Sequence, residues 1–161
     1  MEPKKPIKRN PAIVTFSKDH HFALLLVWKI RQCLKKEIEP SRIINYVAHF
    51  FDTDLIFHFE EEETLLFSKL PSDNLLRLQA EEEHKLIKFE IDALRKNSDD
   101  KMGIENFANI LEKHIRFEER ELFNYLQEIF SEDELSEIAE AMEARTREHE
   151  IAWKDEFWLV S

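Results

Sequence analysis

The chain contains a single glycine in 161 residues, and this shortage restricts its fold more than any other feature. An average protein contains roughly 7% glycine. Hairpins, bulges and tight turns depend on glycine for backbone conformations with positive φ, so a β-rich fold is close to excluded. Helices need almost no glycine, and 43% of the residues are apolar, enough for a buried core. We therefore predict an all-α fold in one domain spanning residues 1–161.

The apolar spacing and the helix start and stop signals predict five helical segments. They lie at about residues 17–37, 41–70, 73–96, 104–130 and 132–157. Ser17 has the character of an N-cap, and Ser131 with Glu134 has the spacing of a capping box. Because the connections are short, successive helices should be antiparallel neighbours. This predicts an up-down-up-down four-helix bundle over about residues 12–130 with an additional C-terminal helix over about 132–157.

Charge and cysteine content exclude several classes of function. The chain has 23 basic and 34 acidic residues, a net charge of −11. Because negative charge repels phosphate, we expect no nucleic-acid partner. Cys33 alone cannot form a disulfide framework or a thiol-based metal site. The longest apolar run, residues 22–28, is far shorter than the roughly 20 residues of a membrane span. The proline-interrupted N-terminus is a poor signal peptide, so we expect no membrane partner and a cytoplasmic location.

Two histidines open the same local pattern, in which a glutamate follows four residues later. The pairs are His58 with Glu62 and His114 with Glu118. Residues four apart lie on one face of a helix, and both pairs continue apolar stripes. Burying a carboxylate on such a stripe is costly unless it is paired or binds a metal.

Counting residues from the turns tests whether the histidines can meet. In an antiparallel hairpin, residues equidistant from the turn lie at the same height. With turns at about 39, 71 and 99, His20 and His58 are both 19 residues from the first turn, and His58 and His84 are both 13 from the second. His84 and His114 are both 15 residues from the third turn. Since the rise is 1.5 Å per residue, four helices each bring one histidine to a common layer.

The histidine at the start of this series has an alternative next to it. From His20 an apolar stripe continues through Leu24 and Val27, whereas the stripe from His21 passes into polar positions. His20 is therefore favoured, and His21 remains an alternative ligand. His149, on the last segment, lies at a comparable depth and is a further candidate for contact with the site.

The predicted metal ligands are four imidazoles and two carboxylates: His20, His58, Glu62, His84, His114 and Glu118. This mixture suits iron, manganese or zinc. Two carboxylates able to bridge favour a pair of metal ions about 3.5 Å apart. The remaining glutamates of the acidic runs 60–63 and 81–83 are interpreted mainly as solvated faces.

Four short motifs carry a resemblance to a known family. They are Asp-His-His at 19–21, His-Phe-Glu-Glu-Glu at 58–62, Glu-His-Lys at 83–85 and His-Ile-Arg-Phe-Glu-Glu at 114–119. In order and spacing they resemble the ligand motifs of hemerythrin-like (HHE cation-binding) domains over about residues 12–130. The resemblance implies a four-helix bundle with a non-haem di-iron centre, for which manganese or zinc could substitute. It also implies that Glu62 and Glu118 bridge the irons and that the four histidines are terminal ligands.

The chain departs from the oxygen-carrying members of this family. Those place two histidines four apart on the third helix, whereas Ala80 and Lys88 stand at these distances from His84, and Glu118 stands where they have aspartate. Fewer imidazoles leave more coordination positions open to water, dioxygen or nitric oxide. The expected function is therefore interaction with such a small ligand in sensing, storage or stress defence, by a metal- and oxygen-binding protein more than by a dedicated enzyme. A metal-dependent regulatory module without turnover and a metal-free acidic helical scaffold are the alternatives.

Overall fold

The structure is a computed structural model that describes residues 9–145. Over these residues the chain forms helices and short connections, with no strand among them, as the scarcity of glycine predicts. None of the helices in this part of the chain has both the length and the hydropathy that crossing a bilayer requires.

The helical elements join end to end into rods. The first rod is α1 (Pro11–Lys35), and the second combines α2 (Pro40–Phe50), η1 (Phe51–Leu55), α3 (Ile56–Glu61), η2 (Glu62–Leu66) and η3 (Phe67–Lys69). The third rod is α4 (Leu75–Lys96), and the fourth combines α5 (Lys101–Phe117), η4 (Glu118–Leu122) and α6 (Phe123–Ile129). A shorter fifth rod is α7 (Glu132–Ala144). Elements η1, η2 and η4 are π-helical turns, and η3 is a 3₁₀ turn at the end of the second rod.

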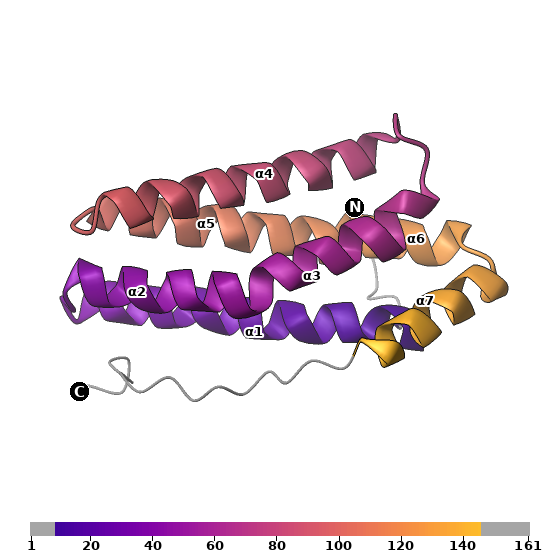
Figure 1. Cartoon of the computed structure of the whole chain (residues 1–161), viewed down its shortest axis with the longest axis horizontal. Coiled ribbons are helices and arrows are strands. Elements are labelled where there is room, and N and C mark those ends of the chain that lie inside the picture. Colours follow the sequence, from indigo (N-terminus) through magenta and orange to yellow (C-terminus); the bar gives the residue numbers. More distant parts are fainter. Residues whose placement is uncertain (1–8, 146–161) are drawn as a thin grey trace, which may run out of the picture.

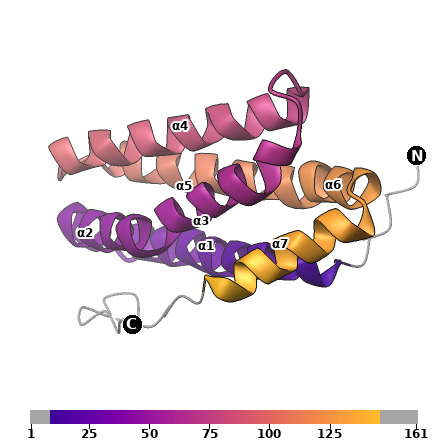
Figure 2. The ribbon, with the colours of Figure 1, turned by 45° about the vertical axis from the view of Figure 1, so that its right-hand side comes forward.

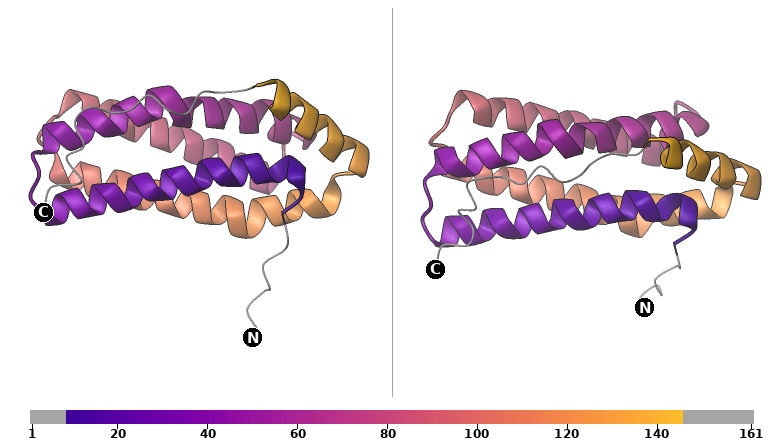
Figure 3. Two further views of the ribbon diagram at one scale, coloured as in Figure 1. Left: turned by 90° about the horizontal axis from the view of Figure 1, so that it is seen from below. Right: turned by 60° about the horizontal axis from the view of Figure 1, so that its bottom comes forward.

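The first four rods lie side by side, and successive rods run in alternating directions (Figure 1). Seen from below, α1 and the second rod lie in front of α4 and the fourth rod (Figure 3). The fifth rod, α7, crosses beside the start of α1 (Figure 2), with which it is in contact. This arrangement is compatible with the predicted up-down-up-down bundle and its additional helix.

The first helix begins six residues before the predicted start at Ser17. Asn10 is the N-cap, and its side chain accepts a hydrogen bond from the main-chain N–H of Ala12 at 2.9 Å. Pro11 then occupies the first helical position, where its fixed φ fits and its missing N–H is not needed. Ser17 therefore lies inside the helix, because the stronger combination of an asparagine cap and a proline precedes it.

The other helix starts lie within three residues of the predicted ones. Asn74 caps α4 by accepting from the main-chain N–H of Arg77 at 3.1 Å, and Asp100 caps α5 by accepting from that of Gly103 at 2.8 Å. At the start of α7 the predicted capping box of Ser131 and Glu134 is present with both of its hydrogen bonds. The predicted extension of this last helix to residue 157 lies beyond residue 145, outside the described residues.

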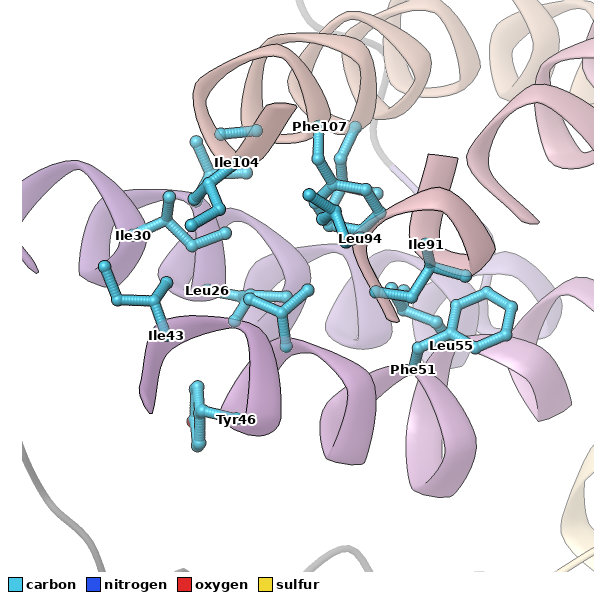
Figure 4. Close-up of a cluster of buried hydrophobic side chains, with 14 of the residues drawn as sticks. Leu26, Ile30, Ile43, Tyr46, Phe51, Leu55, Ile91, Leu94, Ile104 and Phe107 are labelled. Carbon is cyan, nitrogen blue, oxygen red and sulfur yellow. The ribbon is translucent and has the colours of Figure 1, made fainter. Parts of the chain in front are cut away.

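Two apolar clusters fill the bundle. One cluster joins α1, α2, α4 and α5 around Leu26, Ile43 and Phe107, and includes the buried Cys33; its side chains interdigitate between the rods in Figure 4. The other joins the start of α1, the end of the second rod, α6 and α7 around Phe16 and Phe123. The layer between the two clusters is where the counting from turns places the histidines.

Candidate metal centre

Six polar side chains are buried in the layer between the apolar clusters. Each of the four histidines is at most 3% exposed, and the two glutamates are 0% exposed: His20, His58, His84, His114, Glu62 and Glu118. One histidine comes from each of the first four rods, from α1, α3, α4 and α5. The structure thus brings together all six of the predicted ligand residues.

The Nε2 atoms of the four histidines face the two glutamate carboxylates. His58 and His84 place Nε2 at 3.2 and 3.1 Å from Oε1 of Glu62. His20 and His114 each place Nε2 at 3.0 Å from Oε1 of Glu118. The two carboxylates therefore lie at the centre of the layer with the imidazoles around them.

These atoms form two overlapping groups of four possible ligands. One group consists of His20, His58, Glu62 and Glu118, and the other of His84, His114, Glu62 and Glu118. Within each group the ligand atoms all lie within 4.8 Å of one another. Because Glu62 and Glu118 belong to both groups, the two positions share both carboxylates, the arrangement expected when two cations are bridged.

The hydrogen bonding of these side chains tests whether they fit a cation. Atom Nε2 of His58, His84 and His114 and both carboxylate oxygens of Glu62 are buried with no partner in hydrogen-bonding geometry. Buried polar atoms in native proteins nearly always have a partner, and leaving one unsatisfied costs about 1–3 kcal/mol. Imidazole and carboxylate lone pairs converging on a common space are the donor set that iron, manganese and zinc accept. The residues therefore fit a metal centre.

Comparison with known families agrees with this geometry. A model of the hemerythrin HHE cation-binding domain matches residues 12–126, which is more than half of the chain and includes all six buried residues. The chain belongs to the hemerythrin HHE family. No curated protein and no solved structure matched it. Membership of this family implies that the chain binds a metal cation.

A second set of carboxylates surrounds the site of this hemerythrin domain. Each histidine donates through Nδ1 to a carboxylate on a neighbouring rod: His20 to Glu119 at 2.8 Å, His58 to Asp19 at 3.1 Å, His84 to Glu63 at 3.3 Å and His114 to Glu83 at 2.7 Å. A carboxylate of the first rod accepts from the histidine of the second, and one of the second rod accepts from the histidine of the third. In the same way the third rod supplies the acceptor for the fourth, and the fourth supplies the acceptor for the first. We call Asp19, Glu63, Glu83 and Glu119 the carboxylate ring.

The carboxylate ring fixes how the imidazoles can act. A carboxylate accepts but does not donate, so each Nδ1 must carry the proton. In a neutral imidazole this leaves the Nε2 lone pair free and aimed at Glu62 and Glu118. Hydrogen bonds of this kind orient metal-binding histidines and make them better ligands. The ring thus selects the tautomer that metal binding needs.

Arg9 ties one member of the carboxylate ring to the start of α1. Its Nη2 donates to Oε2 of Glu119 at 2.9 Å, and its Nη1 donates to Oδ1 of Asn124 at 2.6 Å. The guanidinium also lies 5.7 Å from the ring centre of Phe123. Phe123 in turn stacks on His20, with ring centres 5.0 Å apart and planes 8° apart. Arg9 therefore holds His20 from two sides, through Glu119 and through Phe123.

Without metal, protons take the place of cations in this hemerythrin site. Burial lowers the pKa of His58, but Glu62 and Asp19 outweigh it and raise the pKa to about 9. Burial lowers the pKa of His114 as well, and Glu118 with Glu83 raises it to about 9. Burial raises the pKa of Glu62, yet His58, His20 and His84 hold it well below its usual value. In the metal-free centre His58 and His114 are therefore imidazolium ions at neutral pH, and Glu62 is a carboxylate.

A small pocket opens between α1 and the second rod beside this centre. It is lined by Asp19, Phe22, Phe50, Asp54, Leu55 and His58. His58 and Asp19 thus connect the buried layer to the surface on this side of the bundle.

Two alternatives raised by the sequence have different outcomes. His21 is exposed on α1 and belongs to neither group of possible ligands, whereas His20 belongs to the first. His149 lies outside the described residues.

The carboxylate ring is what the sequence reasoning missed. Interpreting the acidic runs as solvated faces is wrong for several of their members, because Glu61 is buried and Glu63 and Glu83 bind histidines. A signal was present in the sequence. Each ring member stands directly beside a predicted ligand: Asp19 before His20, Glu63 after Glu62, Glu83 before His84 and Glu119 after Glu118.

Proposed function

We propose that this hemerythrin domain binds two iron ions and that the iron interacts with dioxygen or nitric oxide. The observation that supports the proposal is the pair of overlapping four-residue groups that share Glu62 and Glu118. Shared carboxylates suit two adjacent cations, and imidazole with carboxylate suits iron. Manganese and zinc would be substitutes.

The protein residues have separate tasks in this proposal. His20 and His58 would hold one ion, and His84 and His114 the other, each through Nε2. Glu62 and Glu118 would join the two ions, and the carboxylate ring would hold the Nδ1 protons in place. Bound iron would supply electrons to a diatomic ligand. The apolar clusters on both sides keep bulk water away from the layer, and the pocket beside His58 is the side from which a small ligand could approach.

Iron loading is the first test. Anaerobic addition of ferrous iron to metal-free protein, followed by removal of unbound iron and exposure to air or nitric oxide, should give about two irons per chain, as the two ligand groups require. It should also give a change in the near-ultraviolet absorption on exposure. A chain that retains no iron, or whose bound iron is unchanged by both gases, would refute the proposal.

A matched pair of variants separates a metal centre from a metal-free scaffold. Glu62→Gln preserves shape but removes a carboxylate that both groups share. Metal affinity should therefore fall by at least about 100-fold, more than the 10- to 100-fold loss typical when a residue that only hydrogen-bonds to a metal ligand is replaced. Glu60→Gln changes an exposed glutamate two residues away and should bind iron as the wild type does. Equal iron content in the two variants would favour the scaffold.

A further inference from the structure

Helix α4 carries a stripe of apolar side chains on its outer face. The α4 stripe consists of Leu75, Leu78, Leu86 and Phe89, which are 81%, 41%, 43% and 68% exposed. The opposite face of α4 is buried through Ala80, Ile87 and Ile91. A helix that is apolar on two opposite faces has more apolar surface than one bundle can cover, and apolar patches on a surface mark contacts with a partner.

Among residues 9–145, the neighbours of α4 leave this stripe open. Helix α4 packs on α5, α2 and η4, and in Figure 1 it forms an outer edge of the bundle. The described part of α7 crosses on the side of α1, where it contacts α1 and η2. The spacing of the stripe, three residues between Leu75 and Leu78 and between Leu86 and Phe89, is that of a helix that packs along another helix.

The charges on α4 identify the partner. Residues 75–84 carry a net charge of −2 and residues 85–96 a net charge of +2. Glu83 contacts His114 and Arg95 pairs with Asp52 within the chain, which leaves −1 on the first half and +1 on the second half for a partner. A helix with opposite charge on its two halves is complementary to an antiparallel copy of itself. It would be repelled by a parallel copy, in which like halves face each other.

We propose that two copies of this chain dimerise through an antiparallel pairing of their α4 stripes. With the twofold axis between residues 83 and 84, Leu78 of one copy lies opposite Phe89 of the other, and Glu82 lies opposite Lys85. Twofold symmetry repeats both contacts. Glu82 and Lys85 are 72% and 74% exposed and pair with each other along the helix at 3.2 Å, and across the twofold axis each can pair with its counterpart in the other copy instead. The histidine layer faces the interior, so the dimer does not depend on the metal.

Sedimentation velocity of the purified full chain over a concentration series tests the apolar part of the contact. The wild type should dimerise, and Leu78→Glu should weaken the dimer by at least about tenfold, as loss of a central interface residue does. The matched control is Leu25→Glu on α1, since Leu25 is 39% exposed and Leu78 is 41%; it should leave the dimer intact. A monomeric wild type, or dissociation by the α1 variant alone, would overturn the proposal.

Charge reversal tests the antiparallel register. Glu82→Lys and Lys85→Glu alone each place like charges opposite one another and should weaken the dimer by about tenfold. The double variant restores opposite charges across the twofold axis and should restore the dimer. An equimolar mixture of the two single variants should form a heterodimer more readily than either variant forms a homodimer. If the double variant dimerises as weakly as the single variants, the proposed register is wrong.

Iron content measured on the same variants should stay at the wild-type value, which separates this proposal from the proposed function.

Discussion

At the scale of single residues, each histidine of the centre uses its two ring nitrogens differently. Nε2 faces the shared glutamates, and Nδ1 donates to the carboxylate ring. A ring member can therefore influence metal binding without touching a metal. Removing such a hydrogen bond typically lowers metal affinity 10- to 100-fold.

Arg9→Gln should weaken one metal position more than the other. Arg9 supports Glu119 and Phe123, which both contact His20, and no equivalent link reaches the group of His84 and His114 among the described contacts. The metal affinity of the group that contains His20 should fall by about tenfold. A calorimetric titration of the variant with metal should therefore show two separate binding steps.

Arg31→Gln is the control for the Arg9 variant. Arg31 also joins the first and fourth rods, through an ion pair with Glu112 at 3.1 Å, but it does not touch the histidine layer. The Arg31 variant should titrate with metal as the wild type does. Identical titrations for the two arginine variants would show that Arg9 acts only as a general link between helices.

The metal-free protein should become less stable as the pH rises from 6.5 to 9. The pKa values of His58 and His114 are about 9 in the fold and about 6.5 in an unfolded chain. A raised folded pKa stabilises the fold fully below pH 6.5, and this contribution is lost as the pH rises through 9. Urea unfolding of the metal-free protein at several pH values measures this loss. The variant His114→Gln should show a shallower loss, and the exposed-site variant His21→Gln should match the wild type.

Metal affinity should change with pH in the opposite sense. Binding requires neutral imidazoles, so protons must leave His58 and His114 before a cation enters. Affinity should rise with pH between 6.5 and 9, and bound metal should be released in mild acid. Titration with manganese in buffers of different pH measures both effects, and an affinity independent of pH would argue against histidine ligands.

At the scale of elements, two π-helical turns begin at the glutamates that the two groups share. Turn η2 starts at Glu62 and turn η4 at Glu118, and both follow the same pattern, His-x-x-x-Glu-Glu. A π turn is wider than an α turn, which reduces the angle between consecutive side chains. The first glutamate of each pair faces the centre, while the second, Glu63 or Glu119, reaches the histidine of the next rod. The π turns thus place two consecutive carboxylates on the same site.

The end of α1 uses a left-handed residue that is not glycine. Among the described residues, Glu37 alone has a positive φ, 55°. The main-chain N–H of Ile38 donates to the carbonyl of Cys33 at 3.0 Å, and that of Glu37 donates to the carbonyl of Leu34 at 3.3 Å. These bonds form a Schellman motif, in which glycine is the usual residue at this position.

Glu37→Gly should therefore stabilise the protein by about 1 kcal/mol, because the left-handed conformation costs a residue with a side chain about 1–2 kcal/mol and glycine regains part of this. Lys36→Gly is the control. Lys36 has an ordinary φ of −87°, so glycine there relieves no strain, adds freedom to the unfolded chain and should destabilise. Chemical denaturation of both variants measures the difference, and a loss of stability in the Glu37 variant would contradict the argument.

At the scale of the whole molecule, the centre joins four rods, so metal should stabilise the entire bundle. Metal binds the folded state and not the unfolded one, and one site at 100 times its dissociation constant adds about 2.7 kcal/mol. For a chain of this size that should raise the melting temperature by about 5–10 °C. Thermal denaturation with and without a chelator measures the shift. Glu62→Gln should melt at the same temperature under both conditions.

The helical class and the ligand layer could be predicted because they follow from local rules. The shortage of glycine excludes most turns of β structure, and a regular rise per residue converts distance from a turn into height in the bundle. In the structure the four histidines that the counting placed at one level meet at the two shared glutamates, with Nε2–Oε1 distances of 3.0–3.2 Å. The start of α1 was misplaced, because the prediction used Ser17 as the cap and passed over the stronger signal of Asn10 followed by Pro11; in the structure the Asn10 side chain accepts the hydrogen bond.

The sequence by itself determined that the chain is helical, that six ligand-type side chains share one layer, and that most of the excess negative charge remains outside. The reason is that these properties depend on residue type and on spacing along one chain. Only the tertiary structure decided which carboxylate meets which histidine. Asp19 stands beside His20 but binds His58, and Glu83 stands beside His84 but binds His114. Such pairings depend on the rotation of each rod about its axis, which is set by packing against its neighbours and not by position in the sequence.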